Sequence, residues 1–195
     1  MSINWNSSPP RPGFPGWLDR ITGTEATTAE LLLQFIPPAI FAIAAPIYAQ
    51  NLAVNWTYLQ LGLISLLGFD LVGGVLTNAT SSAKRWFHRE GQTWQDRLVF
   101  VSIHIIHIFL VALLFRGSDW GFFAIASSYL IGSSILILQT PLYLQRPVAF
   151  GFYGLALLGN SYLFEPTVGL EWFLPLFFFK ILISHLLKEA PYSPE

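Results

Sequence analysis

Four ionisable side chains lie inside long apolar stretches of this sequence. They are Asp70, His104, His107 and Lys180. An ionisable group in the hydrocarbon core of a membrane costs at least a few kcal/mol, so it normally faces a protein interior or a wet cavity and marks a functional site. These four residues are therefore the candidate catalytic residues.

The two central histidines are spaced for joint use. His104 and His107 are three positions apart, which places both imidazoles on one face of a helix. Such a pair can supply two ligands to a divalent transition metal such as zinc, with His185, His88 or Asp70 as a third ligand and His185 as the first choice. The same pair could instead provide general bases or a proton relay, with Asp70 orienting a histidine or activating water.

Lys180 lies in the aromatic and aliphatic segment LPLFFFKILISH. At 1.5 Å per helical residue it lies roughly 11 Å from the inner end of its helix, too far for a lysine stem of about 6 Å to reach the headgroups. Two interpretations remain open. Lys180 forms an ion pair with Asp70, or it is an uncharged amine that forms a Schiff base or binds an anionic group.

The helix that carries Asp70 has a polar face. The residues of this face recur at the spacing of one helix face: Asp70, Gly73, Gly74, Thr77, Asn78 and Ser81. The glycines would let a neighbouring helix or a ligand approach the backbone closely. Packing of small residues between helices is the alternative explanation of this face.

A basic, aromatic loop follows that face. It has the sequence TSSAKRWFHREGQTWQDR. Basic residues near a membrane surface attract anionic lipids by about 1 kcal/mol each. We expect Arg85, His88 and Arg89, together with Thr77 and Asn78, to bind a lipid substrate; membrane orientation and surface binding are the alternative role of the loop.

The composition indicates an all-α integral membrane protein. The chain is 53% hydrophobic and 11% charged, against about 25% charged residues in an average soluble domain. A membrane-spanning helix needs about 20 apolar residues. The sequence predicts a bundle of about six such helices, at residues 30–49, 56–78, 98–115, 120–140, 147–163 and 168–187.

The predicted organisation is a single membrane domain with two tails. Residues 1–29 are expected to form a flexible N-terminal tail, residues 30–187 the six-helix domain and residues 188–195 a C-terminal tail. A capping-box pattern, Thr27 followed by Glu30, marks the start of the first span.

The basic residues predict the orientation. Eight of them lie on one side of the predicted spans: Arg11, Arg20, Lys84, Arg85, Arg89, Arg97, Arg146 and Lys188. Only Arg116 lies on the other side. Because cytoplasmic loops are enriched in Lys and Arg, both termini are expected to be cytoplasmic. This orientation places Asp70, His104, His107 and Lys180 at a similar depth in the inner half of the membrane.

These features favour an intramembrane enzyme that acts on a lipid or another amphiphile near the cytoplasmic leaflet. Its chemistry would be metal-assisted hydrolysis or acid–base catalysis, with Lys180 stabilising developing negative charge. A small-solute or proton transporter that uses the same polar core is the alternative. A non-catalytic scaffold or haem-binding subunit is the third. The net charge of −1 gives no reason to expect a nucleic-acid partner, and the absence of cysteine excludes thiolate chemistry and disulfides.

Overall fold

The computed structural model describes residues 3–52 and 54–192, in which the regular secondary structure is helical apart from one isolated antiparallel bridge between Ile3 and Tyr192. The helical elements are α1 (Gly13–Thr22), α2 (Thr28–Gln50), α3 (Tyr58–Ala79), α4 (Ser81–Phe87), α5 (Trp94–Ile103), α6 (Ile105–Phe115), α7 (Trp120–Gln139), α8 (Leu142–Tyr162), α9 (Phe173–Phe178) and the π-helical segment η1 (Phe179–His185).

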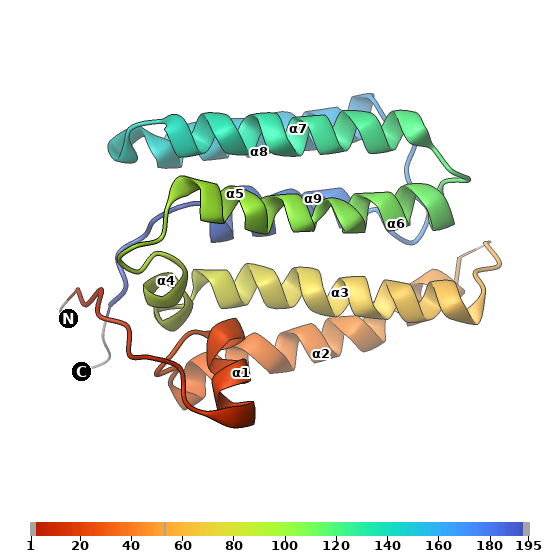
Figure 1. Ribbon diagram of the computed structural model, residues 1–195. Coiled ribbons are helices and arrows are strands. Elements are labelled where there is room, and N and C mark those ends of the chain that lie inside the picture. Colours follow the sequence, from red (N-terminus) through yellow and green to blue (C-terminus); the bar gives the residue numbers. More distant parts are fainter. Residues whose placement is uncertain (1–2, 53, 193–195) are drawn as a thin grey trace.

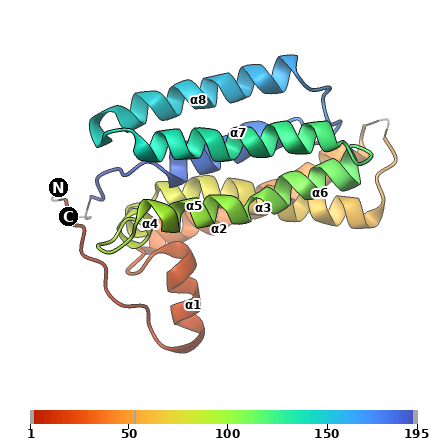
Figure 2. The same cartoon turned by 45° about the horizontal axis from the view of Figure 1, so that its top comes forward.

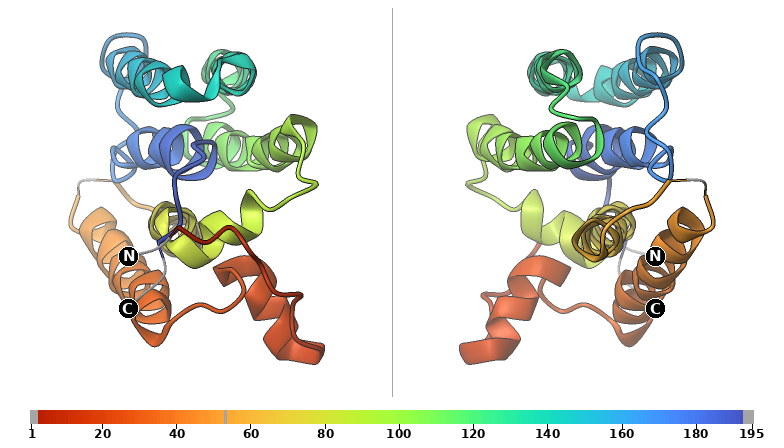
Figure 3. Two further views of the ribbon diagram at one scale, coloured as in Figure 1. Left: turned by 90° about the vertical axis from the view of Figure 1, so that its left-hand side faces the viewer. Right: turned by 90° about the vertical axis from the view of Figure 1, so that its right-hand side faces the viewer.

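The long helices form three stacked pairs. α5 continues into α6 as one rod, and α9 continues into η1 as a second rod (Figure 1). The first layer holds α2 and α3, the middle layer holds the α5–α6 and α9–η1 rods, and the third layer holds α7 and α8 (Figure 3). Helices α1 and α4 lie at the end of the bundle where both ends of the described chain meet (Figure 1).

Four segments are long and apolar enough to cross a membrane: α2, α3, the combined segment Trp94–Phe115, and α7. They match the predicted spans 30–49, 56–78, 98–115 and 120–140 to within a few residues. The predicted count of about six is not confirmed. α8, predicted at 147–163, begins earlier and is less apolar, and the last apolar segment, Phe173–His185, is shorter than the predicted 168–187.

The outer surface of the bundle is apolar. Ile40 and Ile43 of α2 are 62% and 65% exposed, and Leu66 of α3 is 64% exposed. Apolar side chains that are exposed along whole helices indicate a surface that contacts lipid or another protein. This supports the assignment to the membrane.

Three helices begin with a capping box. The predicted pair Thr27 and Glu30 is confirmed, since the Thr27 hydroxyl accepts from the Glu30 amide and the Glu30 carboxylate accepts from the Thr27 amide. Thr57 caps α3 and Thr93 caps α5 in the same way. Each box satisfies two backbone donors that a helix start leaves free.

The flexible tail predicted for residues 1–29 is not confirmed. Residues Gly13–Thr22 form α1, which lies beside α4 (Figure 2). Arg11 forms an ion pair of 2.7 Å with Asp19, which is buried. Gly23 has a φ of +86°, and a Cβ there would lie 2.2 Å from the backbone of Ser82. The packing of this segment therefore depends on a contact distant in sequence.

Candidate functional site

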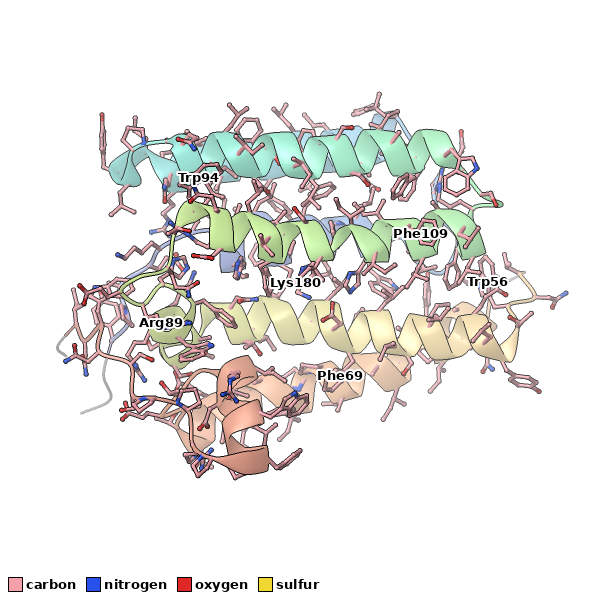
Figure 4. The ribbon with its side chains drawn as sticks, viewed as in Figure 1. Trp56, Phe69, Arg89, Trp94, Phe109 and Lys180 are labelled. Carbon is pink, nitrogen blue, oxygen red and sulfur yellow. The ribbon has the colours of Figure 1, made fainter. Side chains whose placement is uncertain are left out.

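Asp70 and Lys180 form an ion pair in the middle of the bundle. The Lys180 Nζ donates to Oδ2 of Asp70 over 2.6 Å. The side chain of Lys180 is only 3% exposed, whereas that of Asp70 is 41% exposed. In Figure 4, Lys180 lies between α3 and the α5–α6 rod. Of the two interpretations of Lys180, the structure contains the ion pair.

Gly74 makes room for this ion pair. A Cβ on Gly74 would lie 2.2 Å from Cε and 2.5 Å from Cδ of Lys180, because the lysine stem crosses α3 at this glycine. Gly74 and Asp70 are four residues apart and share a helix face. The neighbouring Gly73 instead faces α2, where its Cβ would lie 3.5 Å from Pro38. The close approach predicted for the glycine face is thus made by Lys180 at Gly74.

His107 contacts the same oxygen of Asp70. Its Nε2 lies 2.9 Å from Oδ2 of Asp70, and its Nδ1 lies 3.2 Å from the carbonyl oxygen of His104. A carbonyl oxygen only accepts, so Nδ1 carries a proton. For the second contact also to be a hydrogen bond, another proton must lie between Nε2 and the carboxylate. With a proton on each nitrogen, His107 is an imidazolium whose Nε2 proton lies against Asp70 and can be donated.

His104 interrupts its helix and leaves one nitrogen free. α5 ends at Ile103 and α6 starts at Ile105, and the Nδ1 of His104 donates to the carbonyl oxygen of Phe100 over 2.7 Å. Because Nδ1 carries the proton, the neutral ring has an unprotonated Nε2. This Nε2 makes no hydrogen bond within the described residues. The ring stacks on His107, with centroids 5.2 Å apart and planes 10° apart.

His185 lies further towards the end of the bundle that carries α4. Its Nδ1 is 3.1 Å from Oδ1 of Asn78, and its ring stacks on Phe100 with centroids 3.8 Å apart. Phe100 also contacts His104, at 4.4 Å between centroids. His185 is therefore separated from His104 by an aromatic ring, although Lys180 and His185 belong to the same π-helical segment.

The predicted metal ligands do not come together as a set. His107 has hydrogen-bond partners at both nitrogens, and Phe100 lies between His104 and His185. In the part of the chain that the structure describes, no three His, Asp or Glu side chains are grouped as a metal site requires. The arrangement thus does not fit a zinc centre built from His104, His107 and His185.

The residues expected to bind a headgroup converge only in part, since His88 and Arg89 line one cavity of about 310 Å³ whose lining does not include Arg85, Thr77 or Asn78. Arg85 is buried at 6% exposure, and its Nε has no partner among the described residues. The guanidinium carbon of Arg89 lies 3.8 Å from the ring centroid of Trp86, which is three residues earlier in the chain. Thr77 donates to Gln34 of α2 over 3.3 Å. Arg85 is thus buried and Thr77 bonds to Gln34, and neither lines the cavity that His88 and Arg89 share.

Lys84 and His88 instead cap the end of the last helix. Lys84 Nζ donates to the carbonyl oxygens of Ser184 and Leu187 over 2.7 and 2.6 Å. His88 Nε2 lies 3.0 Å from the carbonyl oxygen of His185. Carbonyls at a helix end lack partners within the helix, so this capping fixes the segment that carries Lys180. Sequence reasoning missed this role, although the spacing of four residues places Lys84 and His88 on one helix face.

Burial changes the protonation of these two capping residues. It lowers the pKa of Lys84 to about 8, while the carboxylate of Glu189, 3.4 Å away, acts in the opposite direction. Burial, with the positive charges of Lys84 and Arg97, lowers the pKa of His88 to about 3. A neutral His88 agrees with its contacts, because one nitrogen faces a carbonyl and the other faces Arg97.

Replacement of Lys84 by Met is expected to lower the free energy of unfolding at pH 7 by about 2–3 kcal/mol, because two buried carbonyl groups lose their donor.

The pKa of Lys84 in the folded chain, about 8, is below its ordinary value of 10.5, so the unfolded chain binds the proton more readily. The part of the stability that depends on this titration therefore rises from pH 8 to pH 10.5 and falls as the pH is lowered to 8, whereas the hydrogen bonds of the ammonium to the two carbonyls are present at pH 7. Thermal unfolding in detergent between pH 7 and pH 11 would measure this slope. It should vanish in Lys84→Met and persist in the exposed control Lys188→Met; parallel profiles for wild type and Lys84→Met would contradict the assignment.

Gln34 is a second residue that sequence reasoning missed. It is 2% exposed, donates to the carbonyl oxygen of Thr22 over 3.3 Å and accepts from Thr77. It joins the start of α2 to α3 and to the segment after α1. The sequence could have indicated Gln34, because it is one amide side chain within the apolar run LLLQFI.

Comparison with known protein families, with curated proteins and with solved structures finds no match to this chain. The assignment of function therefore follows from the arrangement of Asp70, His104, His107 and Lys180.

Proposed function

We propose that this chain is a six-span membrane enzyme that performs acid–base hydrolysis on an ester-linked lipid or a similar amphiphile. The spans are α2, α3, α5–α6, α7, α8 and α9–η1, with both ends of the chain in the cytoplasm. The excess of Lys and Arg at the end of the bundle that carries α1 and α4 supports this orientation.

One observation carries the proposal. Lys180 and His107 both contact Oδ2 of Asp70, which leaves Oδ1 without a hydrogen bond in the described residues, on a side chain that is 41% exposed. A membrane protein that needed Asp70 only for packing would gain from enclosing it, because an open polar atom in hydrocarbon is costly. The open oxygen favours a role in contacting a ligand.

The neighbouring groups supply the parts of a hydrolytic step. The free Nε2 of His104 would take a proton from water as the water oxygen attacks the ester carbon. The ammonium of Lys180 would offset the negative charge that develops on the carbonyl oxygen. As the carbon–oxygen bond breaks, the proton held between His107 and Asp70 passes to the departing alcohol oxygen, and the proton on His104 then restores that pair.

The distribution of polar groups favours this reaction over transport. Among the described residues beyond His107, towards the other end of the bundle, the fully buried residues are apolar and include Ile108, Val111, Phe173 and Phe177, although the Ser127 hydroxyl and the Trp56 indole nitrogen are also buried there. A relay across the membrane would need ionisable or hydrated groups along the whole path. The polar core reaches one end of the bundle only.

Release of fatty acid by the purified full chain tests the proposal. The protein would be placed in nanodiscs of phosphatidylethanolamine and phosphatidylglycerol in ¹⁸O-labelled water, and labelled fatty acid would be measured by mass spectrometry. We expect labelled product from the wild type and at least a hundredfold less from His104→Gln, since general-base catalysis contributes about 10²–10⁴-fold. Ser133→Ala, which removes a hydroxyl bonded within α7, is the matched control and should retain activity.

The alternative outcomes separate the two functions. Equal label release in wild type and His104→Gln, with both proteins monodisperse, would overturn the hydrolytic mechanism, as would the absence of product from the wild type. Proton flux into liposomes that requires Asp70 would instead assign the same residues to transport.

A further inference from the structure

A cavity of about 540 Å³ lies away from Asp70, at the end of the bundle where both ends of the described chain meet. It is formed where α3 meets α4, by the first turns of α8 and by the segment after η1. Ala79, Leu142 and Leu187 provide apolar lining. The cavity lies where the long helices end, which is the level of lipid headgroups in the proposed orientation.

The cavity is positively charged. Lys84, Arg146 and Lys188 line it, with Glu189 as the carboxylate among its lining residues. Lys84 is already engaged by the carbonyls at the end of η1 and by Glu189, and the ammonium of Lys188 lies 4.7 Å from the ring centroid of Trp5. Arg146 has no ion pair or hydrogen bond among the described residues, so its guanidinium is the cation best placed to bind an added anion such as a phosphate.

A buried acceptor also lines the cavity. Gln145 is 8% exposed, and its Nε2 donates to the carbonyl oxygen of Thr140 over 3.1 Å. This contact fixes the amide orientation, because Oε1 at the same place would face another acceptor. Oε1 is buried and has no donor within the described residues. A buried acceptor without a partner costs about 1–3 kcal/mol, so a ligand with an N–H or O–H donor would satisfy it.

These groups together select the chemistry of the ligand. Arg146 can pair with an anion, whereas the buried Oε1 of Gln145 needs a hydrogen-bond donor. A phosphate linked to a primary amine supplies both. The first turn of α8 adds exposed Leu142 and Tyr143, at 59% and 81% exposure, which suit the boundary between acyl chains and headgroups.

We propose that this cavity binds a phospholipid with a primary-amine headgroup. The phosphate pairs with Arg146, the ammonium donates to Oε1 of Gln145, and the acyl chains lie along the apolar surface beside Leu142. The charge of Glu189, which Lys84 already engages, would attract any cationic headgroup and does not distinguish among them. This site does not depend on the hydrolytic function proposed for Asp70, and it does not use the headgroup residues predicted from the sequence.

Native mass spectrometry of the full chain in detergent tests the site. The probes are phosphatidylethanolamine and phosphatidylcholine with the same acyl chains, because the three methyl groups of choline remove every N–H donor. We expect the wild type to bind phosphatidylethanolamine about tenfold more tightly, the effect of one hydrogen bond to a charged group. Gln145→Met should abolish this preference, whereas Arg146→Met should weaken both lipids about tenfold. Arg20→Met, which removes a cation elsewhere at the same end of the bundle, is the control and should match the wild type.

Any of four results would overturn the proposal. The first is equal binding of the two lipids by the wild type, and the second is a preference that survives in Gln145→Met. The third is binding of soluble glycerophosphoethanolamine as tightly as the lipid, which would assign the site to a water-soluble phosphorylated amine. Arg146→Met keeps the test decisive if Gln145→Met is not monodisperse, because Arg146 is exposed and unchanged affinity in that variant would also contradict the site.

Discussion

Replacement of Asp70 by Asn is expected to lower the free energy of unfolding by about 3–5 kcal/mol, the usual result of removing one partner of a buried ion pair. The ammonium of Lys180 would stay buried, at 3% side-chain exposure, without its carboxylate. Lys180→Met should cost less, because Asp70 keeps His107 and is 41% exposed. The variants would be compared by unfolding them in detergent and measuring, at each step, how readily a labelled probe reaches the buried core.

The double variant Asp70→Asn/Lys180→Met is the control for this prediction. It removes both charges, so it should recover a large part of the stability lost in Asp70→Asn. Additive losses in the double variant, or an Asp70→Asn protein as stable as the wild type, would show that the ion pair does not stabilise the bundle.

Replacement of Gly74 by Ala is expected to lower the free energy of unfolding by about 2–4 kcal/mol. The added methyl group would overlap the Lys180 stem, so the lysine must move away from Asp70. Overpacking costs about 1–3 kcal/mol and a lost charge-assisted hydrogen bond about 1.5–3 kcal/mol, while Ala gains about 1 kcal/mol over Gly in a helix. The same unfolding assay measures the difference.

Gly73→Ala is the matched control, one residue away on the same helix. Its Cβ would make an ordinary contact of 3.5 Å with Pro38, so its stability should stay within about 1 kcal/mol of the wild type. Lys180→Ala should relieve the clash, so Gly74→Ala should cost little in that background. Equal losses for Gly73→Ala and Gly74→Ala would refute the steric explanation.

Much of the fold follows from local sequence. Apolar runs of about 20 residues determine α2, α3, α5–α6 and α7, because a chain in lipid must satisfy its backbone hydrogen bonds internally. Thr27 and Glu30 determine the start of α2, since a capping box needs only residues three positions apart. Local sequence did not show that residues Gly13–Thr22 form α1, because that segment packs against α4, which is distant in sequence.

The sequence also determined the content of the polar core. The occurrence of Asp70, His104, His107 and Lys180 in apolar runs indicates one cluster, because each group needs a partner in a medium without water. It did not determine the partners. In the structure His104 bonds to the backbone carbonyl of Phe100, whereas His107 contacts Asp70.

Only the tertiary structure decided which polar residues serve the site and which serve the fold. His88 was predicted to bind a headgroup or to serve as a third metal ligand, and Lys84 was a basic residue of the same loop, yet both bind carbonyl oxygens about 100 residues later in the chain. The need for these donors arises when η1 ends beside α4, because free carbonyls at a helix end must find partners from another segment. Gly74 and Lys180 likewise meet only when α3 packs against η1, so their contact depends on the packing of helices and not on any local pattern.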